Sequence, residues 1–263
     1  MTAALEPAAL DLAALDLAGL TKTFGTNAAV DHLDLTIPQG SFYGLVGQNG
    51  AGKTTTLSMA VGLVRPDSGT ARIFGTDVWA DPRHRAKRLV GVLPDGLAMP
   101  ERLTGREVLT YLGLLRGLPE PLVAERAGEL LEVLELDQAG STLVIEYSTG
   151  MRKKIGLATA LLHAPRLLVL DEPFEAVDPI SAATIKQILR AFVAGGGSVV
   201  LSSHVMALVE QLCDHVAVID KGKVVAAGTL EEVSGGGSLE ERFVDLVATG
   251  DRAAMKGLTW LPS

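Results

Sequence analysis

The sequence predicts an α/β protein: a mostly parallel β-sheet covered by helices, with an N-terminal antiparallel β subdomain and an inserted α-helical subdomain. Three observations predict this class. Continuous apolar runs, which suit strands covered on both faces, alternate with helical patterns along the chain. The first runs instead alternate apolar and polar residues, as half-exposed antiparallel strands do. Between about residues 97 and 147 the apolar residues recur at helical spacing.

The strands divide into two groups by their pattern. Alternating strands of the N-terminal subdomain are expected at Leu15–Thr23, Val30–Ile37 and Thr70–Phe74. Strands of the parallel sheet are expected where the residues are mainly apolar without a break, at Phe42–Val46, Val90–Leu93, Leu167–Leu170, Ser198–Ser202 and His215–Asp220. A helix over Thr54–Val61 follows the first of these runs.

The helical insertion contains two apolar stripes. Leu103, Val108, Leu109, Leu112 and Leu115 form the first, and Leu122, Leu130, Leu131, Val133, Leu134 and Leu136 form the second. We expect residues 15–233 to form the main domain with this insertion. Residues 234–263 are expected to hold a glycine-rich linker, a short amphipathic helix at Leu239–Val247 and a tail.

Composition limits the possible functions. Of 263 residues one is a cysteine, Cys213, which argues against a disulfide framework or a cysteine-based zinc site. The formal net charge of −8 argues against nucleic acid as the main partner, because such binding rests on a basic surface. No window approaches about 18 uninterrupted apolar residues, and the N-terminal segment lacks the basic start of a signal peptide. We therefore expect a cytoplasmic protein without a membrane span.

The strongest motif is a phosphate-binding loop. Residues Gly47–Thr54 read Gly-Gln-Asn-Gly-Ala-Gly-Lys-Thr and match G-x-x-x-x-G-K-[ST], between a predicted strand and a predicted helix. In such a loop backbone N–H groups surround phosphate oxygens at the positive end of a helix. Lys53 is expected to reach the β- and γ-phosphates, and Thr54 to offer its hydroxyl to Mg²⁺. The alternative is a flexible glycine turn, but the context favours nucleotide binding.

Acidic and histidine side chains follow two other predicted strands. Asp171 and Glu172 come directly after Leu167–Leu170, at the edge where open α/β sheets bind ligands. Asp171 can hold Mg²⁺, and Glu172 can polarise a water for attack on the γ-phosphate. Acids in this place often only cap the next helix, but the phosphate loop favours the catalytic interpretation. His204 follows another strand and can bond the γ-phosphate.

A second anion site is expected at the start of another helix. Ser148 is a plausible N-cap, and the free N–H groups of Thr149, Gly150 and Met151 follow it. Taken alone, this stretch indicates a capped helix only.

These motifs, in this order over roughly residues 17–228, resemble those of the ATP-binding subunit of an ABC transporter. The resemblance implies a P-loop NTPase core with Walker A at Gly47–Thr55 and Walker B at Leu167–Glu172. It also implies that Ser148–Met151 is the signature loop, Glu175–Pro179 the D-loop and His204 the switch histidine. Asp178 could communicate between two sites, and could also cap the helix that Pro179 begins.

The resemblance assigns roles to individual residues. Phe24 stands where the family stacks an aromatic ring on adenine, and the alternative is an ordinary core phenylalanine. The residues implied to bind ATP are Phe24, Gly47, Gln48, Asn49, Gly50, Ala51, Gly52, Lys53, Thr54, Thr55, Ser148 and Gly150. The implied catalytic residues are Glu172, His204 and Lys53, and the implied Mg²⁺ ligands are Thr54, Asp171 and Asp95.

The sequence departs from the family pattern in two places. The signature, usually LSGGQ, is Tyr-Ser-Thr-Gly-Met here, and similar variants are familiar among subunits that serve ABC-2 type exporters. Asp95 stands where the family has a glutamine that helps to complete the Mg²⁺ and water site. A shorter, charged Asp95 could bind the metal directly or through water.

One phosphate loop and one signature turn per chain imply a head-to-tail pair, with ATP between Lys53 of one copy and Ser148 of the other. The resemblance further implies a separate integral-membrane permease, docked on the helical insertion, at the cytoplasmic face of the membrane. The leading hypothesis is an ATPase that powers export. The alternatives are a soluble ABC-type ATPase that acts on ribosomes or nucleic acid, and an ATP-dependent switch with negligible turnover. Glu172 argues against such a switch.

Overall fold

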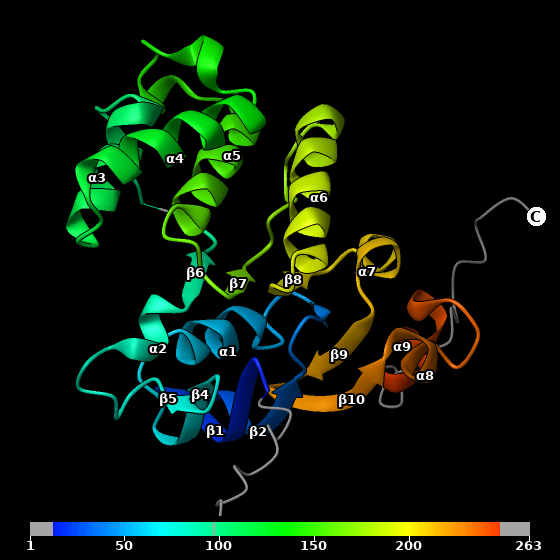
Figure 1. Ribbon diagram of the computed structural model, residues 1–263. Helices are drawn as coiled ribbons and strands as arrows, with labels where there is room; N and C mark the ends of the chain where they lie inside the picture. The colour runs from blue at the N-terminus through cyan, green and yellow to red at the C-terminus, as the bar shows by residue number, and fades with distance from the viewer. Residues whose placement is uncertain (1–12, 97, 248–263) are drawn as a thin grey trace, which may run out of the picture.

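The computed structural model describes residues 13–96 and 98–247, and contains two β-sheets and a helical lobe (Figure 1). The predicted tail beyond Val247 lies outside the described residues. The strand and helix order agrees with the predicted α/β class. None of the helices in the described ranges has the length and apolar character that a membrane crossing requires.

The N-terminal sheet is antiparallel, with strand order β2-β1-β4-β5. Its strands are β1 (Leu15–Phe24), β2 (Asn27–Ile37), β4 (Ser68–Ile73) and β5 (Thr76–Asp77). Leu15 pairs with Ile37 and Leu17 with Leu35, and all four side chains are buried. The alternation read from the sequence therefore puts the apolar face of this sheet against the rest of the protein.

The central sheet is mixed but mostly parallel, with strand order β10-β9-β3-β8-β7-β6. Its strands are β3 (Phe42–Val46), β6 (Val90–Leu93), β7 (Leu167–Leu170), β8 (Ser198–Ser203), β9 (His215–Asp220) and β10 (Lys223–Thr229). The five predicted parallel strands are confirmed. β10 was not predicted; it pairs antiparallel with β9 at the edge of the sheet.

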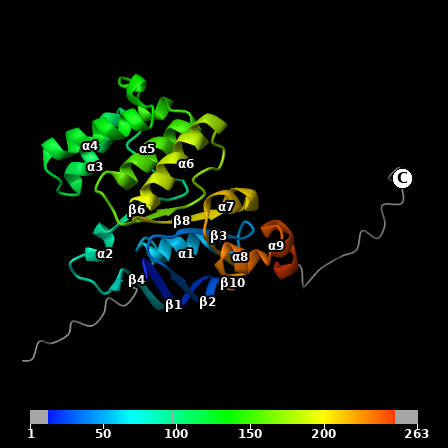
Figure 2. The same ribbon diagram turned by 45° about the vertical axis from the view of Figure 1, so that its right-hand side comes forward.

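Both faces of the central sheet are covered (Figures 1 and 2). On one face, α1 (Lys53–Ala60) lies between the two sheets, and its Leu57 and Met59 share one apolar core with Tyr43 of β3. The other face packs against the helical lobe and against α6 (Pro179–Ala194) and α7 (Met206–Leu212). This double burial explains why the central strands are continuously apolar.

The helical lobe confirms the predicted insertion. It consists mainly of α3 (Gly105–Leu115), α4 (Glu120–Val133) and α5 (Thr149–Leu161). Thr104 and Glu107 form a reciprocal capping box that begins α3, which satisfies backbone N–H groups that would otherwise lack partners. The short helices η1 (Asp137–Ala139) and η2 (Val144–Glu146) connect α4 to α5. Outside the lobe, the short helix α2 (Arg85–Arg88) lies between β5 and β6.

The C-terminal helices pack on the same core. α8 (Leu230–Ser234) is joined through a glycine-rich turn to α9 (Leu239–Val247). Leu239 and Phe243 of α9 are buried in the core cluster that contains Val209 of α7. The apolar face of α9 is therefore used for packing within the chain.

Gly91 lets the lobe approach the sheet, which generates a stability prediction. A Cβ on Gly91 would meet the backbone oxygen of Ala160 in α5 and the side chain of Leu168. We expect Gly91→Ala to destabilise the protein by about 1–3 kcal/mol through overpacking, a fall in Tm of roughly 3–10 °C. Gly128→Ala is the matched control, because a Cβ there meets nothing within 4 Å and Gly128 is inside α4.

The control should raise Tm slightly, since alanine is the better helix former by about 0.5–1 kcal/mol. Thermal unfolding followed by circular dichroism measures both variants. Equal melting temperatures for Gly91→Ala and the wild type would contradict the close packing of α5 on β6.

Candidate active site

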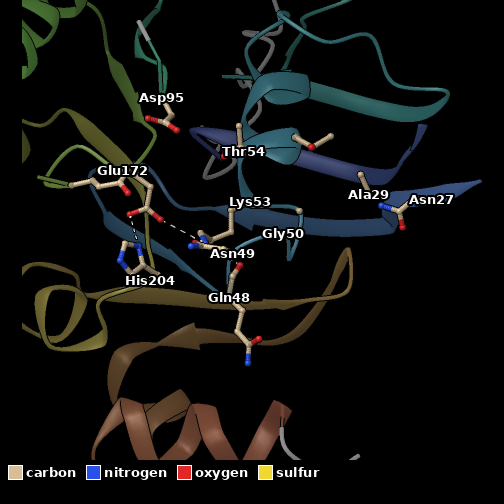
Figure 3. A pocket seen from close by; sticks show the side chains of 13 residues that line it. Asn27, Ala29, Gln48, Asn49, Gly50, Lys53, Thr54, Asp95, Glu172 and His204 are labelled. Carbon is tan, nitrogen blue, oxygen red and sulfur yellow. Dashed lines mark hydrogen bonds and ion pairs between the residues drawn. The ribbon is translucent and has the colours of Figure 1, made fainter. Parts of the chain in front are cut away.

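Three parallel strands bring the predicted site residues to one edge of the central sheet. In the register of the sheet, Val46 of β3 is opposite Ser203 of β8, and Leu170 of β7 is opposite Leu201. The loops after these strands surround a cavity of about 400 Å³ (Figure 3). Its lining residues are Asn27, Ala29, Gln48, Asn49, Gly50, Gly52, Lys53, Thr54, Thr55, Asp95, Glu172, Glu175 and His204.

The phosphate loop has a conformation that only glycine adopts readily at two positions. Gly50 has φ +82° and Gly52 has φ +107°, both in the left-handed region. A Cβ on Gly52 would also meet the carbonyl oxygen of Ala29, which lies on β2. The sequence pattern thus reflects backbone geometry and close packing, as well as the space in which phosphate oxygens could lie.

The Lys53 ammonium lies inside this loop. Its Nζ donates hydrogen bonds to the carbonyl oxygens of Gly47, at 2.8 Å, and Gln48, at 3.3 Å. The side chain is only 6% exposed, so most of its charge is shielded from water. The same ammonium lies on the wall of the cavity, where a phosphate anion would meet it.

The three predicted catalytic side chains come together. Glu172 Oε1 lies 3.6 Å from Lys53 Nζ, and Glu172 Oε2 lies 3.1 Å from His204 Nδ1 (Figure 3). The Glu172 side chain is 13% exposed, while His204 is 42% exposed. The carboxylate therefore bridges an ammonium and an imidazole at the cavity wall.

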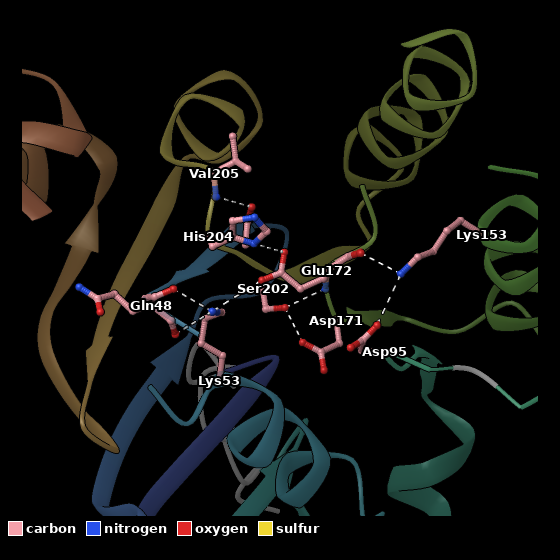
Figure 4. A network of polar contacts seen from close by, with 11 residues as sticks. Gln48, Lys53, Asp95, Lys153, Asp171, Glu172, Ser202, His204 and Val205 are labelled. Carbon is pink, nitrogen blue, oxygen red and sulfur yellow. Dashed lines mark hydrogen bonds and ion pairs between the residues drawn. The ribbon is translucent and has the colours of Figure 1, made fainter. Parts of the chain in front are cut away.

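Asp171, a predicted metal ligand, is buried and is absent from the cavity wall. Its Oδ1 accepts a hydrogen bond of 2.5 Å from the Ser202 hydroxyl, and the same hydroxyl oxygen accepts the backbone N–H of Glu172 at 2.8 Å (Figure 4). Sequence reasoning missed Ser202. The available signal was a serine in an otherwise apolar buried strand, because such a hydroxyl needs a polar partner.

The donor set fits ATP with Mg²⁺. Thr54, which has a hydroxyl, and Asp95, which has a carboxylate, line the cavity, and the buried Asp171 directly precedes the lining residue Glu172. Within residues 13–96 and 98–247, no three His, Cys, Asp or Glu side chains form a cluster able to hold a metal. Mg²⁺ fits such a site because it commonly uses one or two carboxylates together with substrate phosphates. Mg²⁺ binding stays a prediction.

Phe24 lies on the surface at the end of β1. Its side chain is 54% exposed, so the core alternative is wrong. Phe24 pairs with Asn27 in the β1–β2 ladder, and Asn27 lines the cavity. An exposed ring beside the cavity is suited to stacking on a base, and the Lys22 ammonium lies 5.6 Å from the centre of this ring.

The second anion site has the predicted cap but is not part of this cavity. Ser148 Oγ accepts the backbone N–H of Met151 at 3.2 Å and begins α5. A Cβ on Gly150 would meet Asp178, so this helix end lies against the start of α6. Asp178 caps α6, and the N–H of Ser181 is the largest cause of its lowered pKa.

Lys153 is a further polar residue that sequence reasoning missed. Its Nζ donates to the backbone oxygen of Glu172 at 2.9 Å and lies 4.0 Å from Asp95 Oδ1 (Figure 4). No sequence signal identifies such a contact, because the acceptor is a backbone carbonyl that any residue would provide.

The mostly parallel sheet has a glycine-rich phosphate loop after one strand, with an ammonium inside the loop, and carboxylates after another strand. These features define a P-loop nucleotide-binding cassette. The profile of the family described as "ABC transporter" matches residues 30–175, more than half of the chain. The chain belongs to the ABC transporter family, which confirms the resemblance read from its motifs.

Curated relatives are named as ATP-binding proteins. The chain is 42% identical over 215 residues to the daunorubicin/doxorubicin resistance ATP-binding protein DrrA of Streptomyces peucetius, covering 82% of this chain and 65% of that protein. It is 36% identical over 207 residues to the bacitracin transport ATP-binding protein BcrA of Bacillus licheniformis, covering 78% and 66%. The aligned region thus spans slightly less than two thirds of the length of these two relatives.

Solved structures share the fold. The first is a structure described as the ATP binding subunit of an ABC transporter, with 30% sequence identity and a TM-score of 0.81. The match covers 88% of this chain and 98% of the other chain. A dimeric ATP-binding cassette in a post-hydrolysis state, 23% identical with a TM-score of 0.75, shows the same fold over 82% of this chain and 98% of its own.

The exposed ring of Phe24 gives a binding prediction. We expect Phe24→Ala to weaken ATP binding about 5- to 150-fold, because stacking of a base on an aromatic ring is worth about 1–3 kcal/mol. The affinity for inorganic tripolyphosphate should not change, since it has no base. Tyr111→Ala is a matched control, because Tyr111 is similarly exposed, at 52%, but lies on the helical lobe.

Isothermal titration calorimetry of the three proteins with both ligands measures this difference. If Phe24→Ala loses affinity for ATP and for tripolyphosphate by the same factor, the role of Phe24 is structural. An unchanged ATP affinity would remove it from the nucleotide site.

Proposed function

We propose that this chain binds Mg²⁺·ATP in the cavity, hydrolyses it, and thereby powers export of a substrate through a separate permease at the cytoplasmic face of the membrane. The observation that carries the hydrolytic part is the contact of Glu172 with Lys53 and His204. In this contact the Lys53 ammonium, which would bind phosphate, and the His204 imidazole lie on either side of the Glu172 carboxylate, which would act as the base. The transport part rests on the family and on the relatives named for resistance and transport.

Binding begins with the phosphate loop. Its backbone N–H groups and the Lys53 ammonium offset the negative charge of the β- and γ-phosphates, in surroundings where charge interactions are stronger than in water. Lys53 already faces Glu172 Oε1 at 3.6 Å. A phosphate that reaches Lys53 competes for this cation, and Glu172 is then free to accept a proton.

Hydrolysis then needs a base and a positioned water. Glu172 is expected to accept the proton of a water that attacks the γ-phosphate, a role typically worth about 10²–10⁴-fold. His204, which lies 3.1 Å from Glu172, can donate a hydrogen bond to the carboxylate or to the phosphate. Mg²⁺ supplies positive charge for the phosphate oxygens, and Thr54, Asp171 and Asp95 are the residues that would hold it.

A second copy of the chain would complete the site. Ser148 and Gly150 do not line the cavity of their own chain. Two apolar side chains beside the catalytic loops are left exposed: Ile180, at 75%, follows the cap residue Asp178, and Val205, at 46%, follows His204. Exposed apolar groups next to a polar cavity support a head-to-tail dimer that covers both.

The helical lobe offers a surface for the permease. Tyr111, Leu114 and Leu115 of α3 are exposed by 52%, 46% and 70%.

The acidic net charge and the relatives named for transport and resistance weigh against the alternative of a soluble ATPase acting on ribosomes or nucleic acid.

The role of Glu172 is tested by Glu172→Gln, which keeps the size of the side chain but removes its basicity. We expect ATP affinity within about threefold of the wild type and phosphate release at least about 100-fold slower. Glu240→Gln is the matched control on the exposed surface of α9, and should leave the rate unchanged. Turnover by Glu172→Gln at the wild-type rate would remove Glu172 from the base role.

The transport role is tested in the native cells with a tagged Glu172→Gln protein, in which ATP should persist. We expect it to sediment with membranes and to retain a polytopic membrane protein. An additional Leu115→Asp change should reduce this recovery, because a charge on an apolar docking surface is costly to bury. Recovery with ribosomes or nucleic acid would overturn the transport role and leave the ATPase chemistry unaffected.

A further inference from the structure

The backbone of Glu172 has an unusual conformation. Its φ is +44°, in the left-handed region where residues with a side chain are uncommon. Such strain persists only where the surrounding structure holds it, and it is frequent at functional sites. Because Glu172 immediately follows β7, this conformation helps to decide where its carboxylate points.

Two hydrogen bonds hold this residue, one on each side of its Cα. The Ser202 hydroxyl oxygen accepts the N–H of Glu172 at 2.8 Å, and the Lys153 ammonium donates to the C=O of Glu172 at 2.9 Å. The Lys153 side chain is 14% exposed, so water competes little for this bond. The contact is made to the main chain, so it fixes the residue without neutralising its carboxylate.

Asp95 provides the counter-charge for Lys153. Its Oδ1 lies 4.0 Å from Lys153 Nζ, at a side chain that is 52% exposed (Figure 4). The position of Asp95 after β6 is the one at which the sequence departs from the family glutamine. A carboxylate there attracts the Lys153 ammonium in a way that a neutral amide would not.

We propose that Lys153 is a positioning residue that acts through the main chain of Glu172, and that Asp95 keeps the Lys153 ammonium in place. The proposal deepens, and rests on, the proposed ATPase function. Lys153 belongs to α5 of the helical lobe, whereas Glu172 follows a strand of the central sheet. The rate of hydrolysis therefore depends on the position of the helical lobe relative to the central sheet.

The first test compares steady-state hydrolysis of Mg²⁺·ATP by the full chain and its variants. We expect Lys153→Met to lower kcat about tenfold with KM for ATP within about twofold, because Lys153 is not among the residues that line the cavity. Lys153→Arg should stay within about threefold of the wild type, since a guanidinium can donate to the same carbonyl. Asp95→Asn should lower kcat about threefold at saturating Mg²⁺, where weaker metal binding would not account for the fall.

Lys87→Met is the matched control, because Lys87 on α2 lies over the Trp79 ring and neither residue lines the cavity. Its kcat should equal that of the wild type. Melting temperatures show whether each variant is folded. If Lys153→Met does not fold, Lys153→Arg and Asp95→Asn decide the outcome, and wild-type kcat in Asp95→Asn would then contradict the proposal.

The second test is a double-mutant cycle, measured in single turnover with enzyme in excess. If Lys153 acts through the Glu172 base, Lys153→Met should not slow hydrolysis further in a Glu172→Gln background. An equal fall in both backgrounds would show that Lys153 acts independently and would overturn the proposal. No hydrolysis by the wild type would defeat the proposed function. Wild-type hydrolysis with unaltered kcat in Lys153→Met would defeat only the positioning role.

Discussion

The carboxyl ends of β3, β7 and β8 lie at one edge of the central sheet because these strands are parallel and in register. Each strand is followed by one part of the site. The phosphate loop follows β3, Asp171 and Glu172 follow β7, and His204 follows β8. The apolar residues of these strands are buried on both faces of the sheet. The positions of the strand ends are therefore fixed by the apolar core and not by the polar side chains of the site.

This arrangement places opposite charges close together in a partly buried space. Lys53 and Glu172 are 6% and 13% exposed, and each would be costly to leave there without a partner. Their mutual contact, together with His204 on the other carboxylate oxygen, reduces that cost when the chain folds. In the proposed function, nucleotide binding would exchange one anion for another around Lys53, which is less costly than introducing a charge into an apolar pocket.

The parts of this structure that depend on local pattern could be predicted from the sequence. β3, β6, β7 and β9 have the predicted bounds because each is a short apolar run buried on both faces. β10 was missed because it is an edge strand with half-exposed, mostly small residues, as in Lys223–Thr229, and it lacks such a run.

The polar network around Glu172 could not be predicted completely from local sequence patterns. The motif predicts Lys53 and the acids after β7, and the structure brings Lys53, Glu172 and His204 together. It does not predict that Ser202 and Lys153 hold the main chain of Glu172, because those contacts arise only when β8 and α5 pack beside β7. The exposure of Phe24, at the last residue of β1, is likewise set by tertiary structure, and the local sequence does not indicate it.

In the proposed dimer, each chain provides only part of the environment that phosphate transfer requires. Val205, next to the lining residue His204, and Ile180, near the start of α6, are exposed apolar side chains. Water that reaches a charged site weakens the charge interactions within it. In the proposed dimer the start of α5 in a second copy, capped by Ser148, would face the phosphates and exclude that water. The same phosphate would then contact Lys53 of one copy and the helix end of the other, so its cleavage would remove the anion that links them. Association of the two chains would thus follow the chemical state of the nucleotide, which is the property that a motor for transport needs.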